Sequence, residues 1–363
     1  MLAVAPEVKS KALDLYLASE AVVGQELARK QLASLLERQW QVSEGVYPRA
    51  TAALLSGRSG TGKTMTARLM CEHLGLAYSE ADATRYTESG YKGLDLQHMF
   101  LGLIEAAARM KDESLESRHA ALGQEPKRTP NVIKREDILE LVEVAQNGVI
   151  LLDEFDKWML RMNHVTGEKD KAIQAELLKM IEGTVEYVTA TDDEVGIPFD
   201  TSRVLIICAG AFVGLFQQVA RRLGLEDVER QAYLQQESFW QQIVPEDFER
   251  FGLLPELAGR LSRHIFTRPL TIDSMRSILT RPGGLLEEYR ARYEAYGVEW
   301  RIGDSAIIKM TEAAMRLSTG ARALDHVVDK LLGGELLFEA SVSERPLALI
   351  LTPEMPRALL VAA

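Results

Sequence analysis

The chain has 363 residues, of which 47% are hydrophobic and 26% charged, as expected of a globular protein with room for one large α/β domain and a smaller one. Its formal net charge of −11 argues against a sequence-wide affinity for DNA or RNA. Two cysteines, Cys71 and Cys208, cannot by themselves build a disulfide framework or a four-ligand zinc site, and neither an export signal nor a membrane span is evident, so we expect a cytoplasmic protein.

The first predicted elements are helices over residues 8–42, where leucines recur at helical spacing. They are interrupted at Val22-Val23-Gly24-Gln25. From the residues alone, a hydrophobic pair followed by glycine is typical of a turn between two helices. A strand is expected next, over residues 50–56.

A glycine-rich loop of the pattern G-x-x-x-x-G-K-[ST] follows this strand and precedes a predicted helix over residues 65–74. The loop consists of Gly57, Arg58, Ser59, Gly60, Thr61, Gly62, Lys63 and Thr64. In such a loop the backbone N–H groups surround a phosphate, the lysine reaches the β- and γ-phosphates, and the hydroxyl residue ligates Mg²⁺. An accidental glycine-rich turn is the alternative, but a strand before the loop and a helix after it favour a site for ATP and Mg²⁺.

A second strand is expected over residues 76–79, and it leads to a segment in which Tyr91 and Lys92 stand between Gly90 and Gly93. An aromatic residue between glycines suits an exposed, mobile loop better than a helix or a strand. Helical spacing resumes over residues 94–110. The polar stretch 111–135 is interpreted as a surface insertion.

The apolar run Val149–Leu152 ends in Asp153 and Glu154, and it is the expected partner of the glycine-rich loop. Asp153 would hold Mg²⁺ with its waters, and Glu154 would orient and polarise the attacking water. The alternative is that these acids only end a buried strand and cap the next helix. With a helix over residues 172–181 and a further apolar strand over 204–208, the pattern predicts an α/β fold with a parallel sheet flanked by helices.

The C-terminal part has a different character, and Pro269 marks the change. We predict a large domain over residues 1–267 and a small, mainly helical domain over residues 268–363. The helices expected in the small domain cover residues 271–279, 285–296, 304–317 and 323–337, and the short strands cover residues 298–302 and 347–351.

Several segments together form a recognisable series. They are Val22-Val23-Gly24-Gln25, the glycine-rich loop, Gly90-Tyr91-Lys92-Gly93, Leu151-Leu152-Asp153-Glu154-Phe155-Asp156-Lys157, Leu177 to Val185, Gly210-Ala211-Phe212, Gly252 to Leu261 and Gly320-Ala321-Arg322. In these motifs and in their order the chain resembles the AAA+ ATPases, and more closely the ClpX-type protein unfoldases and their HslU relatives, over about residues 6–345.

The resemblance implies roles for particular residues. Val22 and Val23 would pack on the adenine, and Arg322 would be the second sensor, contacting the nucleotide of its own subunit. Arg260 would be the arginine finger that reaches the γ-phosphate in a neighbouring subunit, which requires a homo-oligomeric ring, expected to be a hexamer. Without the resemblance, either arginine reads as an ordinary surface or salt-bridge residue.

Tyr91, followed by Lys92, looks like the aromatic residue of the first pore loop, which grips a polypeptide in the central channel. For a lone tyrosine the alternative is packing within its own subunit.

The chain also departs from the ClpX pattern. The cysteine-rich zinc module is absent, the stretch at residues 191–196 is acidic where ClpX is basic, and no conventional polar first sensor is evident near Cys208-Ala209-Gly210. The peptidase-docking tripeptide is matched only loosely by Leu223-Gly224-Leu225, and Gly224 follows a predicted helix, where it reads as a C-terminal cap. We therefore expect no docking of a peptidase.

These features lead to a first hypothesis and two alternatives. The first is an ATP-driven ring that threads or remodels a protein substrate. The second is a nucleotide-switched assembly or maturation chaperone for one partner. The third, a nucleic-acid motor built on the same core, is weakened by the acidic composition and by Tyr91 between glycines.

Overall fold

The apolar runs of the sequence form the strands of a central parallel sheet in a computed structural model. The structure describes residues 10–86, 95–121, 135–160, 167–188, 196–225, 236–317, 319–343, 345–351 and 358–362.

The chain divides into two compact units. The first comprises residues 1–20, 27–57 and 63–266, and the second comprises residues 21–26, 58–62 and 267–363. Two short segments, 21–26 and 58–62, therefore group with the C-terminal part. The expectation of a continuous large domain over residues 1–267 did not include this grouping.

The central sheet belongs to the first unit and has five strands in the order β2-β3-β6-β1-β7. Their bounds are β1 Ala52–Ser56, β2 Tyr78–Asp82, β3 Val149–Asp153, β6 Leu205–Gly210 and β7 Arg263–Phe266. All neighbouring strands run parallel, and Cys208 of β6 lies opposite Leu54 of β1 on one side and Leu152 of β3 on the other. The predicted α/β fold with a parallel sheet flanked by helices is confirmed.

The central strands β1, β3 and β6 are buried on both faces, and their alternate side chains enter different hydrophobic clusters. In β1, Leu54 belongs to the cluster that contains residues of α4 (His98–Ala121), α5 (Arg135–Ala145) and α7 (Gly167–Glu182). Leu55 belongs to the cluster that contains residues of α2 (Glu26–Ser43) and α3 (Lys63–Leu74). A strand buried on both faces requires an almost continuous apolar sequence, which explains why β1, β3 and β6 stand out as apolar runs.

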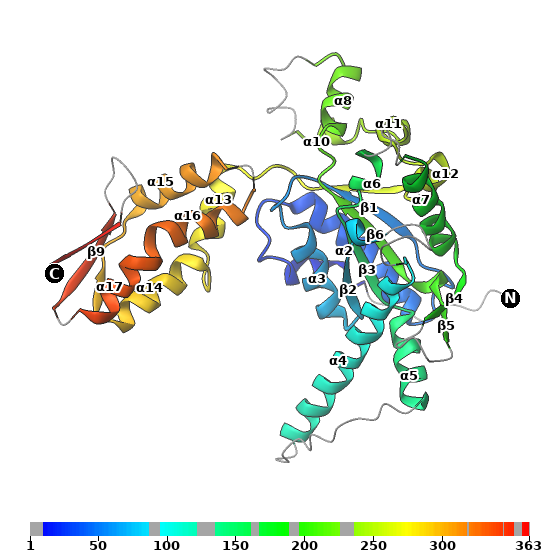
Figure 1. The fold of residues 1–363 in the computed structure, drawn as a ribbon, viewed down its shortest axis with the longest axis horizontal. Coiled ribbons are helices and arrows are strands. Elements are labelled where there is room, and N and C mark those ends of the chain that lie inside the picture. The colour runs from blue at the N-terminus through cyan, green and yellow to red at the C-terminus, as the bar shows by residue number, and fades with distance from the viewer. Residues whose placement is uncertain are drawn as a thin grey trace. The chain divides into compact units, whose positions relative to one another are not determined.

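Helices precede, separate and follow the strands of the first unit (Figure 1). They are α1 Ala12–Ala18, α2 Glu26–Ser43, α3 Lys63–Leu74, α4 His98–Ala121, α5 Arg135–Ala145, α6 Lys157–Leu160, α7 Gly167–Glu182, α8 Leu215–Arg222, α10 Glu237–Trp240, α11 Pro245–Phe251 and α12 Pro255–Arg260. Short 3₁₀ turns occur at Ala83–Arg85 and Thr201–Arg203. The start of the polar stretch 111–135 continues helix α4, and Lys111 forms an ion pair with Glu140 of the neighbouring α5.

A short antiparallel ribbon of β4 Val185–Val188 and β5 Ile197–Asp200 follows α7. The sequence did not predict β5 or β7. These two strands have only four residues each, and β7 begins with Arg263 and His264, so neither shows a clear apolar or alternating pattern.

The second unit contains five helices and a three-stranded sheet among its described residues. The helices are α13 Ile272–Thr280, α14 Leu285–Ala295, α15 Asp304–Met315, α16 Arg322–Leu332 and α17 Gly334–Val342. The strands are β8 Val298–Trp300, β9 Leu347–Leu351 and β10 Ala358–Ala362, in the order β10-β9-β8.

The expectation of one helix over residues 323–337 is wrong, because the helix is interrupted at Gly333, between the end of α16 and the start of α17 at Gly334. Gly334 has φ +55°, in the left-handed region. A Cβ on Gly333 would lie 2.5 Å from the Asp329 Oδ1 atom, so the chain passes close to α16 at this point. A glycine pair with this backbone geometry ends the helix.

None of the helices that the structure describes is long and apolar enough to cross a membrane.

Candidate functional site

The carboxyl ends of β1, β6 and β3 lie side by side, with β6 in the middle. The backbone N–H of Gly57, after β1, donates to the carbonyl of Gly210 at 3.2 Å. The N–H of Phe155, after β3, donates to the carbonyl of Ala209 at 2.9 Å. The last two residues of β6 therefore bond both to the start of the glycine-rich loop and to the acidic turn. These are the segments in which the sequence predicted nucleotide chemistry.

Lys63 is the first residue of α3, and its ammonium group is turned back toward the beginning of the loop. The Lys63 Nζ atom donates to the Gly57 carbonyl at 2.7 Å, and the residue is only 7% exposed. Gly57 has φ +149°, a backbone geometry that glycine adopts readily. Thr64 follows Lys63 in the first turn of α3 and is half-buried, so its hydroxyl stands at the same edge of the sheet.

The middle of the loop, Arg58 to Gly62, belongs to the second unit, where two other predicted segments contact it. A Cβ on Gly62 would lie 2.7 Å from the Val22 Cγ1 atom, so the loop packs directly on Val22. The Ala321 N–H donates to the Gly60 carbonyl at 3.1 Å. The second unit thus brings together Val22, the loop and the Gly320-Ala321-Arg322 motif. Ser59 lies next to Gly60, and its carbonyl is close to Gly320.

Two other residues that were predicted to contact the nucleotide, Val23 and Arg322, are less buried than Val22. Val23 is half-buried, whereas Val22 is 4% exposed. Arg322 is the first residue of α16 and is exposed. Its guanidinium group is therefore available to a charged ligand.

A pair of backbone–side-chain hydrogen bonds, which the sequence did not predict, fixes the turn after Val23. The Gln25 Nε2 atom donates to the Arg268 carbonyl at 2.8 Å, and the Arg268 N–H donates to the Gln25 Oε1 atom at 2.8 Å. Gln25 is 2% exposed, and the NH₂ group and the carbonyl oxygen of its side-chain amide each form one of these bonds. The partners are 243 residues apart in the chain, so no local pattern could have indicated the pair.

The acidic turn holds Asp153 and Glu154 in different positions. Asp153 ends β3, and its Oδ1 atom accepts a hydrogen bond from the Glu154 N–H at 2.8 Å. Glu154 is exposed and has φ +56°, a left-handed geometry that costs a non-glycine residue roughly 1–2 kcal/mol. The surrounding backbone bonds keep the Glu154 carboxylate in solvent at the end of the strand, where it can contact a water molecule.

Asp156, two residues further on, is a buried acid to which the sequence assigned no role. It is 1% exposed, and its Oδ2 atom accepts a hydrogen bond from the Phe212 N–H at 3.2 Å. Burial raises the pKa of Asp156, against the opposing effects of Lys157 and of the N–H groups of Phe212 and Ala211. Asp156 therefore ties the acidic turn to the segment after β6.

The end of β6 offers no polar side chain for the role of first sensor. Cys208 is fully buried, and burial raises the pKa of its thiol. Gly210 faces Asp156, and a Cβ at this position would lie 2.6 Å from the Asp156 Oδ1 atom. The buried acid thus explains why glycine occupies this position.

Arg260 is the last residue of α12 and bonds to Glu182, the last residue of α7. Its Nε and Nη2 atoms donate to the Glu182 Oε1 atom at 3.0 and 2.6 Å. The side chains of Arg260 and Glu182 are 58% and 44% exposed, so this pair lies on the surface of the first unit. The structure brings Arg260 together with Glu182, a residue to which the sequence assigned no role.

The Leu223-Gly224-Leu225 segment ends helix α8. Gly224 has φ +70°, and the Leu225 N–H donates to the Ala220 carbonyl at 2.9 Å, which is the geometry of a glycine C-terminal cap. Leu223 and Leu225 both pack against the hydrophobic core of the first unit. Tyr91 and Lys92 lie outside the described residues, as does the acidic stretch 191–195.

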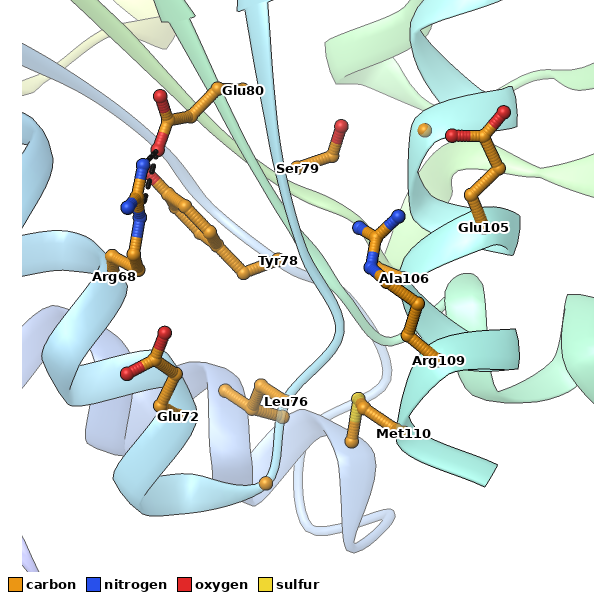
Figure 2. A pocket seen from close by; sticks show the side chains of 12 residues that line it. Arg68, Glu72, Leu76, Tyr78, Ser79, Glu80, Glu105, Ala106, Arg109 and Met110 are labelled. Carbon is orange, nitrogen blue, oxygen red and sulfur yellow. Dashed lines mark hydrogen bonds and ion pairs between the residues drawn. The ribbon is translucent and has the colours of Figure 1, made fainter. Parts of the chain in front are cut away.

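A cavity of about 960 Å³ lies on the edge strand β2, at the opposite end of the sheet from the glycine-rich loop. Figure 2 shows the Arg68–Glu80 ion pair on one wall and Arg109 with Met110 of α4 on the other. Because the lining begins at the C-terminal end of α3 and the start of β2, the cavity does not include the residues predicted to bind nucleotide.

Comparison with known proteins shows what the chain is similar to. Residues 53–232 match the model of the ATPase family associated with various cellular activities (AAA). The chain is 28% identical over 357 residues to the ATP-dependent Clp protease ATP-binding subunit ClpX of Treponema denticola, covering 93% of this chain and 78% of that protein.

Proteins of the same name in two other organisms give similar values. The ClpX subunit of Bacteroides thetaiotaomicron is 28% identical over 300 residues, covering 79% of this chain and 65% of that protein. The subunit of Porphyromonas gingivalis is 28% identical over 331 residues, covering 86% and 73%.

Proposed function

Because the chain is a ClpX-like AAA+ ATPase, we propose that it assembles into a homo-oligomeric ring, a hexamer, that uses ATP hydrolysis to unfold or remodel a polypeptide. One observation carries this proposal. The strand β6 bonds on one side to the loop that Lys63 closes and on the other to the turn that exposes Glu154. Phosphoryl transfer depends on positioning and charge stabilisation, and this arrangement supplies groups suited to both.

The residues of the first unit divide the work at the triphosphate. Lys63 neutralises charge on the β- and γ-phosphates, and Glu154 orients the attacking water. Thr64 and Asp153 hold Mg²⁺, because a hydroxyl and a carboxylate oxygen are hard ligands that suit an ion which keeps several of its waters. When bound, the metal ion neutralises the charge that develops on the phosphate oxygens.

The remaining predicted residues act at the base and at the γ-phosphate. Val22 and Val23 pack on the adenine, the backbone from Gly57 to Gly62 surrounds the phosphates, and Arg322 contacts the nucleotide of its own subunit. Arg260 reaches the nucleotide of the neighbouring subunit. Its exposed position on the first unit supports this role, because a finger must be available to a partner.

The substrate is a polypeptide, and Tyr91 with Lys92 contacts it in the central channel. The relatives are named as ATP-binding subunits of a protease, but we propose that this chain works without a ClpP-type peptidase. The packed leucines on either side of Gly224 support this, since a docking tripeptide has to be presented to its partner.

A nucleotide-switched chaperone for a single folded partner is the second candidate. It would use the same ATPase core and the same arginines, with ATP changing the conformation and little threading. A nucleic-acid motor is disfavoured by the net charge of −11.

The experiment that tests the proposal measures steady-state ATP turnover in the presence of an unfolded polypeptide, of a single folded protein, or of DNA. We expect a permanently unfolded polypeptide, such as a reduced and carboxymethylated protein, to stimulate turnover, and duplex or single-stranded DNA to leave it unchanged. The Glu154→Gln variant supplies the background rate. Stimulation by DNA alone, or by a single folded protein alone, would contradict the threading proposal.

A further inference from the structure

Helix α7 holds the segment that carries Arg260 at two points, one before α12 and one at its end (Figure 1). Before α12, the Gln174 Nε2 atom donates to the Gly252 carbonyl at 3.2 Å, and the Leu254 N–H donates to the Gln174 Oε1 atom at 2.9 Å. Gln174 is fully buried, so water cannot replace these bonds. The start of α12 is therefore fixed to α7.

At the end of α12, Glu182 provides the second attachment. Gln174 and Glu182 lie on the same helix, about two turns apart, and both face the α11–α12 segment. A single carboxylate oxygen of Glu182 accepts from both Nε and Nη2 of Arg260, at 3.0 and 2.6 Å. An arginine side chain has several rotatable bonds, and two hydrogen bonds to one fixed acceptor restrict its guanidinium plane.

The geometry of this fork leaves donors for another ligand. A guanidinium group has five N–H donors, and the two bonds to Glu182 use one on Nε and one on Nη2. Glu182 contacts the edge of the guanidinium group that carries Nε–H and one Nη2–H. The Nη1 group and the second Nη2–H point away from this edge. Arg260 can therefore contact a phosphate while it stays bonded to Glu182.

We propose that Glu182 is a positioning residue for the arginine finger, holding the Arg260 guanidinium ready for the nucleotide of the neighbouring subunit. The inference rests on the proposed trans role of Arg260. In this role Glu182 acts only through Arg260. Without the hydrogen bonds to Glu182, the Arg260 side chain would sample several conformations, and the guanidinium group would have to be oriented anew at each turnover. A displacement of a catalytic group by about 1 Å can lower the rate roughly 100-fold.

The first test is kinetic. In Glu182→Ala rings, we expect kcat for ATP to fall about 10-fold while the KM for ATP stays unchanged, because only the orientation of a transition-state contact is lost. Glu182→Gln keeps an oxygen that accepts from Arg260, so its kcat should stay within about threefold of the parent.

The matched control is Glu294→Ala. It removes the carboxylate of the Arg290–Glu294 pair, whose exposures of 58% and 49% match those of the Arg260 pair, from a helix of the second unit. Its turnover should equal that of the parent. An unchanged or increased kcat in Glu182→Ala would overturn the proposal, as would an equal loss in Glu182→Gln and Glu182→Ala.

A subunit-mixing experiment shows whether Glu182 acts in its own site or in that of its neighbour. When Glu182→Ala subunits are assembled with an excess of Glu154→Gln subunits, each intact Glu154 meets an Arg260 that still has its Glu182. Turnover per intact Glu154 should then rise about 10-fold, toward the parental value. No rise in rings with verified co-assembly would place the effect in the subunit's own site and overturn the proposal.

The Arg260→Ala variant separates failure of this inference from failure of the ring proposal. Arg260→Ala subunits should be inactive alone and should regain turnover with Glu154→Gln subunits. If they do not, the trans finger fails and the role of Glu182 fails with it. If Arg260→Ala is complemented but Glu182→Ala is not, only the role of Glu182 is overturned.

Discussion

Gly210 and Asp156 show how one buried acid restricts its neighbours. The Asp156 side chain is 1% exposed and lies against the backbone of Gly210 at the end of β6. Phe212, whose N–H donates to Asp156, has φ +48°, an uncommon geometry for an aromatic residue. The turn after β6 is thus adjusted to the acid that follows the acidic turn after β3.

We expect Gly210→Ala to lower the free energy of unfolding by about 1–3 kcal/mol, because the added methyl group would lie 2.6 Å from the Asp156 Oδ1 atom. The measurement is urea unfolding followed by circular dichroism. Gly259→Ala is the control: nothing lies within 4 Å of its added Cβ, and alanine favours a helix over glycine by up to about 1 kcal/mol. Equal stability of Gly210→Ala and the parent would show that the turn moves to admit the methyl group.

Glu154 gives a second prediction at this scale. Glu154→Gln should bind ATP and Mg²⁺ as the parent does and lose about 10²–10⁴-fold in turnover, because Lys63, Thr64 and Asp153 remain and only activation of water is lost. Nucleotide binding by fluorescence titration and turnover by phosphate release would be measured on the same preparation. Undiminished turnover would remove Glu154 from its assigned role.

At the scale of elements, the sequence predicted best the parts whose pattern is local and strong. The strands β1, β3 and β6 are apolar runs because both of their faces are buried, and the loop before α3 is a complete motif. The short strands β5 and β7 carry too few residues to show a period, and the break at Gly333 depends on how closely the chain passes Asp329. A helical pattern alone could not reveal that break.

Contacts between distant segments could not be predicted from the sequence either. The bonds between Gln25 and Arg268 and the pair of Arg260 with Glu182 join residues that are far apart in the chain, 243 and 78 positions respectively. Gln25 and Glu182 each lie in a segment that the sequence singled out, but nothing in those segments indicates the distant partner. The sequence therefore offers predictions of the residues that carry chemistry, but it does not indicate the distant contacts that hold segments in place.

The end of helix α8 gives a prediction at this scale. Because Gly224 forms a C-terminal cap and the leucines beside it pack on the core, we expect no stable complex with a ClpP-type peptidase ring and no ATP-dependent degradation in its presence. Size-exclusion chromatography of the mixed rings with ATP is the measurement. Co-elution that disappears in Leu223→Asp would contradict this and make the segment a docking element.

At the scale of the whole molecule, the proposed trans role of Arg260 requires the proposed ring. Arg260 is held on the surface of the first unit by Glu182 of the same subunit, and the account assigns it to the site of a neighbour. A closed ring provides every site with such a neighbour. Hydrolysis would then proceed around the ring, and the energy must reach the substrate through a group in the central channel.

Tyr91 is the residue assigned to that contact. A tyrosine offers a large contact area at little cost in conformational entropy. If Tyr91 packed in the core of its own subunit instead, Tyr91→Ala would cost roughly 3–5 kcal/mol of stability, and assembly and ATPase activity would fall together.

The most direct test of the central claim compares Tyr91→Ala with Tyr91→Phe in one assay of ATP turnover and ATP-dependent unfolding, using a fluorescent protein with an unfolded tail. The account predicts that Tyr91→Ala assembles and hydrolyses ATP within a few-fold of the parent yet fails to unfold the reporter, whereas Tyr91→Phe unfolds it. Normal unfolding by well-assembled Tyr91→Ala rings would contradict threading by this residue. Of the proposed mechanism, only ATP hydrolysis would then remain supported.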